Sequence, residues 1–448
     1  MKPRSSFNLI VFLVVAALIL PGLNQPAVAQ DPVEAWAANV RAQHEGTELV
    51  LAVASHPSIE AFKTMIPRFE ELTGISVVLD EMEEGALGQR LTLEVASETT
   101  SYDIVMTAIE RHPKLADAGY SIPLEPYLND PELTPEWFDY EDILAAYRDM
   151  FVWEDGQHYA IPFAGESVFF FYRTDLFEEH DIEVPTTFDE VLEVARYFDE
   201  NVEGVDGISF RARLGWEFTY MWSVFLFPFG GRMVDPETGE PMLDVPGTAD
   251  SLNYMIELAQ YAPVGIESFS FPEAWDAFML GRAAMMIEAT AAAPEVENPE
   301  KSLVAGNVGY GPMPAGPEGA FSGVWGWGFS ITAGSENQDA AWALIAYLTS
   351  REMQDEYLAN GGIVSRASAL RDPEQQEQYP YYEAILETLE QAAALNELGL
   401  SVVLPIPEWG QFSEILGTEG ARAFIGEISV EEAVTSMQTQ AEELLGGG

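Results

Sequence analysis

The sequence predicts an α/β fold, and two observations carry this prediction. Short apolar runs alternate with amphipathic segments along Glu48–Met106, in the order strand, helix, strand, helix, strand. That order is typical of a parallel sheet with helices on its faces. The chain also has 448 residues and no cysteine, so a hydrophobic core must hold it together without disulfides. A chain of this length can form two ordinary domains.

The elements of this first unit follow from the spacing of apolar residues. Glu48–Ala54, Ile75–Leu79 and Tyr102–Met106 are apolar runs of strand length. Ile59–Thr73 and Leu87–Ser97 carry apolar residues at helical spacing. Ligands bind beyond the carboxyl ends of the strands in such sheets, so we expect the site in the loops that follow them. These loops are His56–Ser58, Glu81–Gly85 and Thr107–Arg111.

A second unit begins near Tyr159. Tyr159–Phe163 and Val168–Tyr172 are interpreted as strands on either side of a loop at Ala164–Ser167. Thr186–Glu190 has the Thr and acidic residues of a helix N-terminus. Further helices are expected at Thr248–Ala262, Pro272–Leu280, Gln338–Thr349, Arg351–Asn360 and Val430–Leu445.

Residues 1–29 have the pattern of a secretory signal. A basic start precedes an apolar run at Leu9–Leu20, and small residues follow at 27–29. The run is too short to anchor the chain in a bilayer. We therefore expect cleavage near Ala29 and export to the periplasm, without a lipid anchor because no cysteine is present.

The charge balance is strongly acidic. The chain has 74 acidic and 20 basic residues, for a net charge of −54. Self-repulsion on this scale disfavours the compact state at low salt, whereas molar salt shortens the Debye length to about 3 Å. We interpret the acids as a solvated surface suited to a halophilic source, with a function-specific acidic patch as the alternative. Nucleic acid is excluded as a partner because little would neutralise its phosphates.

Sequence signatures of enzymes and metal sites are missing. The chain has no G-x-S-x-G elbow and no P-loop, and its five histidines never fall at i, i+4. The lack of cysteine removes thiolate zinc sites and Cys nucleophiles. Carboxylate pairs are too abundant to mark a glycosidase. We therefore expect no catalytic residue, no metal and no cofactor.

Aromatic residues gather in three stretches, Phe169–Tyr172, Trp222–Phe229 and Gly323–Phe329. Sugars and polyols pack their C–H faces on flat rings and offer hydroxyls to charged side chains. The first stretch is interpreted as a buried strand. Glycines beside Trp325 and Trp327 open space near their rings, so these two are candidates for a ligand platform, with core packing as the alternative.

Short motifs extend over Glu48–Leu445 in a fixed order. They are Gly88–Thr92, Tyr102–Val105, Ile161–Ser167, Tyr172–Phe177, Pro185–Glu190, Phe229–Arg232, Gly281–Met285, Trp325–Gly328, Gly361–Arg366 and Pro405–Trp409. With these motifs the chain resembles the family 1 extracellular solute-binding proteins of ABC importers, the maltodextrin-binding type. Within that family it is most similar to the mannitol- and sorbitol-binding proteins.

The resemblance implies a periplasmic binding protein-like type II fold, with two α/β lobes, a hinge of several crossings and a ligand cleft between them. The N-terminal lobe would comprise residues 47–160 and about 309–365, and the C-terminal lobe 161–308 and about 366–448. It further implies a monomer that captures a sugar or polyol. The ligand would pass to the transmembrane subunits of an ABC permease and their ATPase.

The resemblance also implies the ligand-binding residues. They are Glu84, Glu110, Gly165, Glu166, Ser167, Trp222, Arg232, Trp325, Trp327 and Arg366. Glu166 and Arg366 would bind hydroxyls, Trp325 and Trp327 would stack on the ligand, and Tyr220 or Trp222 would add a wall.

Two departures from the polyol-binding pattern leave the particular ligand open. Thr107–Glu110 is shorter than the corresponding loop of those proteins, and Ile363–Ser365 replaces a Pro-rich turn. Two other functions also stay open at this level. One is a secreted carbohydrate-active hydrolase that uses a carboxylate pair, and the other is a chemosensory sugar-binding protein.

Overall fold

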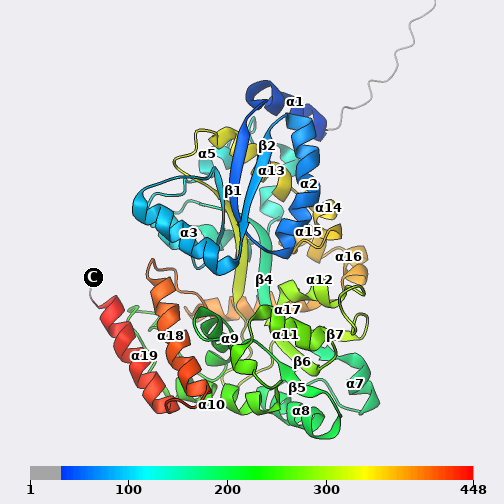
Figure 1. The fold of residues 1–448 in the computed structure, drawn as a ribbon, viewed down its shortest axis with the longest axis vertical. Helices are drawn as coiled ribbons and strands as arrows, with labels where there is room; N and C mark the ends of the chain where they lie inside the picture. Colours follow the sequence, from blue (N-terminus) through cyan, green and yellow to red (C-terminus); the bar gives the residue numbers. More distant parts are fainter. Residues whose placement is uncertain (1–31, 447–448) are drawn as a thin grey trace, which may run out of the picture.

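The computed structural model describes residues 32–446, so the expected signal at 1–29 lies outside the described residues. The chain forms two lobes, one above the other in Figure 1. Strand pairing is continuous from one lobe to the other, in the order β2-β1-β3-β8-β4-β6-β5, with β7 also paired to β4. Within residues 32–446 no helix is long and apolar enough to cross a membrane.

The upper lobe contains the expected parallel unit. β1 (Glu48–Ala54) lies between β2 (Ser76–Met82) and β3 (Ile104–Ala108), and both pairings are parallel. β8 (Val324–Ile331) returns antiparallel to β3. Helices α2 and α3 flank this sheet on opposite sides (Figure 1). The helices of this lobe are α1 (Pro32–His44), α2 (Pro57–Thr73), α3 (Glu84–Ser97), α4 (His112–Asp117), α5 (Glu125–Leu128), α6 (Ala145–Arg148), α13 (Gln338–Thr349), α14 (Gln354–Ala359) and α15 (Ala367–Leu370).

Local signals explain where α2 begins and ends. His56 is its N-cap and accepts the Ser58 N–H at 3.2 Å through Nδ1, and Pro57 occupies the first turn, where a missing N–H costs nothing. The helix ends at Thr73, with Gly74 as its C-cap, as the sequence predicts. Its apolar face, which includes Phe62 and Phe69, is buried.

The sheet of the lower lobe contains both antiparallel and parallel strand pairs. β6 (Ala283–Ala289) and β7 (Val308–Gly311) pair antiparallel with the second half of β4 (Ile161–Arg173), and β5 (Asp206–Ser209) pairs parallel with β6. Its helices are α7 (Thr174–Glu179), α8 (Phe188–Asn201), α9 (Trp216–Leu226), α10 (Pro246–Leu258), α11 (Phe271–Met279), α12 (Ala293–Val296), α16 (Pro373–Gln378), α17 (Tyr382–Glu397), α18 (Trp409–Phe424) and α19 (Val430–Leu445).

Strand β4 belongs to both lobes. Its first half pairs with β8 in the upper lobe and its second half with β6 and β7 in the lower one. The prediction of two strands around a loop at Ala164–Ser167 is therefore wrong. Gly165, Glu166 and Ser167 lie in extended register opposite residues 324–326 of β8. The polar, small-residue composition suggested a turn, but the β8 ladder satisfies the backbone of these residues.

The helix predictions agree better with the structure. The helix that begins in Thr186–Glu190 is α8, which has a capping box between Thr187 and Glu190. α13 and α19 have the predicted bounds. The expected lobe limit at 160/161 falls at the start of β4, and the limit near 309 falls within β7.

Candidate functional site

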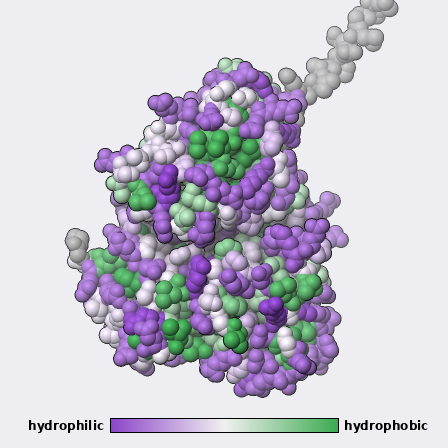
Figure 2. Space-filling view, in the orientation of Figure 1, coloured by the Kyte–Doolittle hydropathy of each residue, from purple (hydrophilic) through white to green (hydrophobic). Residues whose placement is uncertain are grey.

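A cavity of about 760 Å³ lies between the lobes. Loops after β1 and β3 and the first turns of α3 form its upper wall, α9 and α11 contribute to its lower wall, and β4 and β8 form its back. A furrow crosses the molecule between the lobes in Figure 2. Pro57, Gly85 and Glu110 of the cavity lining come from the three loops that the strand order singled out. The volume is typical of small-molecule sites.

Arg111 holds two carboxylates at the upper wall. Its Nη2 lies 3.1 Å from Oε1 of Glu84 and 3.3 Å from Oε1 of Glu110. Burial disfavours the charged guanidinium, but these carboxylates outweigh that effect and raise the pKa of Arg111. Burial also raises the pKa of Glu110, against the lowering effect of Arg111. Nη1 of Arg111 is buried without a partner in the described part of the chain, so both of its N–H groups are left for a ligand.

His56 links the upper lobe to the shared strand. Its Nε2 lies 3.1 Å from Oε1 of Glu166, on β4. Because Nδ1 accepts the Ser58 N–H, the ring proton must reside on Nε2, which donates to Glu166. The carboxylate of Glu166 is thereby oriented at the back of the cavity, with further acceptor capacity for a ligand hydroxyl.

Trp325 and Trp327 line the cavity from β8. Trp327 lies under the Arg111 guanidinium, whose Cζ is 5.2 Å from the ring centroid, and Trp325 lies 4.3 Å from the Tyr220 ring centroid. The glycine between them does not open space beside the rings. A Cβ at Gly326 would lie 2.6 Å from Cε of Met150 and 2.7 Å from the backbone oxygen of Ala164. The opposite face of the strand requires that glycine for close packing.

Arg211 and Glu288 form a buried ion pair under the lower wall. Nε of Arg211 donates to both carboxylate oxygens, at 3.1 and 2.9 Å, and Nη2 donates to Oε1. Burial disfavours the charge of Arg211, but Glu288 outweighs this and raises the pKa of the guanidinium. Its Cζ lies 4.1 Å from the ring centroid of Tyr220. Arg211 is thus a fixed, charged support beneath the lower wall.

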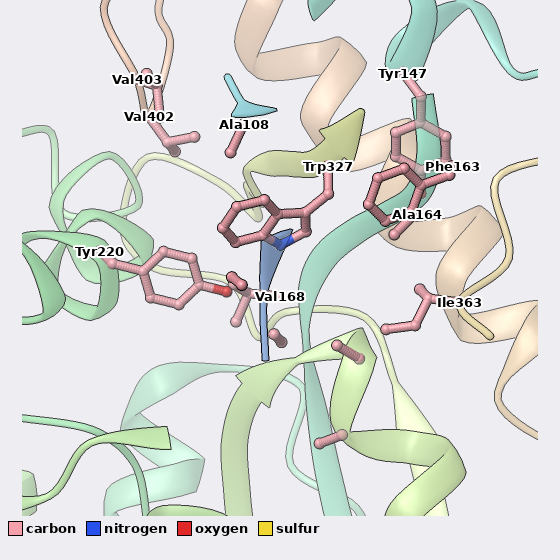
Figure 3. Close-up of a cluster of buried hydrophobic side chains, with 14 of the residues drawn as sticks. Ala108, Tyr147, Phe163, Ala164, Val168, Tyr220, Trp327, Ile363, Val402 and Val403 are labelled. Carbon is pink, nitrogen blue, oxygen red and sulfur yellow. The ribbon is translucent and has the colours of Figure 1, made fainter. Parts of the chain in front are cut away.

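Two unpaired polar atoms lie at the same wall. Oη of Tyr220 and Nε1 of Trp275 are buried and have no hydrogen-bond partner among the described residues. Both residues line the cavity, and Figure 3 shows the Tyr220 hydroxyl directed toward the space beside the Trp327 indole. An unsatisfied buried polar group costs about 1–3 kcal/mol. A ligand or water that accepts and donates hydrogen bonds would remove that cost.

Five of the ten residues expected to bind ligand line this cavity. They are Glu84, Glu110, Glu166, Trp325 and Trp327. Tyr220, expected as one of two possible walls, also lines it. The other five lie outside the cavity lining, and they are Gly165, Ser167, Trp222, Arg232 and Arg366.

Trp222 and Arg366 serve the core of their lobes. Trp222 is fully buried, and its indole N–H donates to Oγ of Ser251 at 2.9 Å. Arg366 is 3% exposed and donates to three backbone oxygens of other upper-lobe segments, at 2.6, 3.0 and 2.6 Å. Burial lowers the pKa of Arg366 to about 10. Their hydrogen-bonding groups are occupied within the protein, which removes the physical basis for a ligand contact.

The remaining three residues also have internal partners. Gly165 packs against the ring of Tyr147, and the hydroxyl of Ser167 lies 2.7 Å from that of Thr388. Arg232 is half-buried and donates to the backbone oxygen of the preceding residue. Gly165 and Ser167 flank Glu166 without lining the cavity, and no sequence neighbour of Arg232 lines it.

Sequence reasoning missed several cavity residues that carry charge or hydrogen-bonding groups, and four of these belong to the walls described above. They are His56, Arg111, Arg211 and Trp275. His56 and Arg111 lie in loops already marked as sites by the strand order, so their position was a usable signal. Arg211 follows β5, which was not predicted as a strand. No cluster of side chains suited to a metal ion occurs within residues 32–446.

Two lobes that share a strand, with a cavity walled by both, define a protein that binds a small polar solute. The comparison with known proteins gives the particular family. The chain belongs to the bacterial extracellular solute-binding proteins, whose family model matches residues 54–355.

Individual relatives agree with this assignment. The chain is 26% identical to the mannitol-binding protein of Pseudomonas aeruginosa over 424 residues, covering 90% of this chain and 95% of the relative. It is 25% identical to the erythritol/L-threitol-binding protein of Mycolicibacterium smegmatis over 330 residues, covering 70% and 69%. An ABC transporter solute-binding protein of Agrobacterium radiobacter, solved in complex with ribitol, superposes with a TM-score of 0.82 at 26% identity, covering 90% and 99%.

Proposed function

We propose that this protein is the substrate-binding component of an ABC importer, which captures a sugar or polyol between its lobes. The observation that carries the proposal is the composition of the cavity. Indole rings at Trp325 and Trp327 lie beside charged donors and acceptors from both lobes, which suits a ligand with C–H faces and many hydroxyls. The polyols named for the relatives support this ligand class.

The ligand would act by joining the lobes. Arg111, Glu84 and Glu110 belong to the upper wall, whereas Arg211 and Tyr220 belong to the lower one. A polyol that contacts both walls favours the closed arrangement by its differential affinity. The closed form would then deliver the ligand to the transmembrane subunits of the permease, and their ATPase would drive release.

Several finer points belong to the same proposal. We propose that the protein acts as a monomer in the periplasm after cleavage near Ala29, and that it binds its ligand without catalysis. The lobes are proposed to divide near the limits that the resemblance implies, 47–160 with about 309–365 and 161–308 with about 366–448. Two elements at these limits belong to the other lobe, because β7 pairs with the second half of β4 and Ser368 of α15 hydrogen-bonds to Asp142. Glu84, Glu110, Glu166, Trp325 and Trp327 are proposed as ligand contacts.

Thermal shift with a panel of alditols, mono- and disaccharides and amino acids, in molar salt, tests the ligand class. A ligand at a hundred times its dissociation constant stabilises the protein by about 2.7 kcal/mol. We expect shifts with alditols or sugars and none with amino acids. Trp327→Ala should lose the shift, while Trp153→Ala, outside the cavity lining, should keep it. No shift with any alditol or sugar would overturn the proposal.

Prolonged incubation of the protein with ligands that shift its melting temperature tests the absence of catalysis. We expect each ligand to be recovered unchanged by mass spectrometry. A product that accumulates with wild type and not with Glu110→Gln would contradict a purely binding role.

A further inference from the structure

The part of the cavity around Arg111, here called the inner cavity, contains more negative than positive side chains. Three carboxylates, from Glu84, Glu110 and Glu166, share the cavity with Arg111. His56 takes part as a hydrogen-bonding group, because its Nδ1 accepts a backbone N–H while Nε2 donates to Glu166. One guanidinium therefore faces three carboxylates at the upper and back walls.

The neighbouring cations do not compensate for this excess. Arg211 at the lower wall is neutralised by Glu288, which is fully buried behind it. Arg213 near α9 is likewise paired with Glu217. At the cavity rim, Lys114 and Glu414 are both exposed, have opposite signs and are screened by solvent.

Unpaired polar atoms at the opposite wall show that this cavity is built for a ligand. Tyr220 and Trp275 are 6% and 9% exposed, and Oη of the first and Nε1 of the second lack partners within the described chain. With Arg211 beside them, these groups form a donor-rich wall of no net charge. The two walls thus differ, because the lower one offers donors to hydroxyl oxygens and the upper one offers carboxylates in excess.

We propose that the cavity selects a polyhydroxylated ligand that carries an amino group, such as an amino-alditol or amino sugar. The ammonium group would lie against the carboxylates of Glu84, Glu110 and Glu166, and the hydroxyl chain would lie toward Tyr220 and Trp275. This inference rests on the proposed function and narrows its ligand class. The same charge distribution rejects carboxylated and phosphorylated polyols, because a ligand anion would add a fourth negative group to a poorly solvated site.

The electrostatics of the upper wall agree with this geometry. Burial raises the pKa of Glu110, and the carboxylates of Glu84 and Glu166 add to the rise. A cation bound between these groups would relieve their mutual repulsion, whereas a neutral hydroxyl would leave it in place.

Titration calorimetry with D-glucitol, D-glucamine and D-gluconate tests the proposal, because the three share a hydroxyl chain and differ at one terminal group. Experiments at neutral pH and constant molar salt keep the amine charged and the fold compact. We expect D-glucamine to bind at least tenfold more tightly than D-glucitol, and D-gluconate to bind at least tenfold more weakly. Equal affinities for the amine and the neutral alditol would overturn the inference.

Two matched variants test whether the preference for D-glucamine depends on the carboxylates around Arg111. Glu110→Gln removes one carboxylate of the inner cavity and should reduce the preference for D-glucamine over D-glucitol about tenfold, while D-glucitol binding changes less. Glu193→Gln makes the same chemical change on the exposed surface of α8, outside the cavity lining, and should leave the preference within twofold. An unchanged preference in Glu110→Gln would contradict the inference even if wild type prefers the amine.

The outcome also separates this inference from the proposed function. Binding of D-glucitol or another neutral alditol without preference for the amine leaves the sugar or polyol function intact and overturns the inference alone. Absence of binding by D-glucamine and by every alditol and sugar of the panel overturns both.

Discussion

Tyr220 combines a buried side chain with an unpaired hydroxyl. The residue is 6% exposed, and its hydroxyl has no partner among the described residues. The ring is nevertheless held in place between Trp325 and the Arg211 guanidinium. A side chain that is fixed by packing while its polar atom is unpaired is prepared for an external partner.

Tyr220→Phe should therefore weaken ligand binding without loss of stability. Removal of an unpartnered buried hydroxyl also removes its desolvation cost, so the free energy of unfolding should rise by about 1 kcal/mol, while loss of one ligand hydrogen bond costs about 1 kcal/mol of binding. Calorimetry with the strongest ligand of the panel should show affinity about fivefold lower. Tyr147→Phe is the control, because that buried hydroxyl is also unpaired but does not line the cavity. Equal loss of affinity in both variants would contradict a specific role for Tyr220.

His112 makes stability depend on pH. Its ring is 3% exposed among Phe151, Trp153 and Tyr159, and burial lowers its pKa from 6.5 to about 4. The folded state holds the ring neutral, so unfolding between these pKa values takes up a proton. Stability from this residue is complete above pH 6.5 and is lost as pH falls toward 4, by roughly 2 kcal/mol at pH 5.

Urea unfolding of wild type and His112→Phe at pH 7 and pH 5 measures this effect. The carboxylates of the chain titrate in both proteins, so the comparison isolates the histidine. The stability lost between the two pH values should be smaller in the variant by roughly 2 kcal/mol. An equal loss in both proteins would mean that His112 is not held neutral.

Half of the ten ligand-binding residues that the resemblance implied line the cavity. The carboxylates and indoles could be found because the motifs that contain Glu166 and Trp327 lie on the cavity-facing strands. Arg366 could not be distinguished from a ligand contact, because its role depends on backbone oxygens of distant segments. Arg111 and Arg211 act through partners far apart in sequence, at Glu84 and Glu288. Pairings of that kind are set by the tertiary fold.

At the scale of elements, strong periodicity gave reliable predictions. The strand Glu48–Ala54 and the helices Gln338–Thr349 and Val430–Leu445 have the predicted bounds. The main failure was β4, where Gly165-Glu166-Ser167 suggested a loop. Its strand character comes from pairing with β8, which lies more than a hundred residues later in the chain. Local composition cannot report such a partner.

Gly165 shows how tightly β4 is fixed at this point. A Cβ there would lie 2.1 Å from the ring of Tyr147, which is fully buried and cannot move into solvent. Gly165→Ala should therefore destabilise the protein by about 1–3 kcal/mol through overpacking. Gly311→Ala, on β7, is the control, because a Cβ there meets nothing within 4 Å. Urea unfolding that gave equal stabilities for the two variants would contradict this account of the strand.

At the scale of the whole molecule, negative charge exceeds positive charge both inside the cavity and over the whole chain. Inside the cavity, three carboxylates face Arg111, and across the whole chain 74 acidic residues face 20 basic ones. The carboxylates inside the cavity are buried and have specific partners, so salt screens their repulsion weakly. The acidic residues on the surface are solvated, so salt screens their repulsion strongly. Ionic strength should therefore affect stability more than the selectivity of the cavity.

The large net negative charge of the chain predicts that the folded state is more stable at high salt. At a net charge of −54, self-repulsion opposes the compact state, and it weakens as the Debye length falls from about 10 Å at 0.1 M to about 3 Å at 1 M salt. The melting temperature should rise by several degrees between these concentrations, equally in sodium and potassium chloride. Sucrose at the same osmolality is the control, because it strengthens burial without screening charge. An equal rise in sucrose, or none in salt, would show that repulsion between surface carboxylates does not limit the stability of this protein.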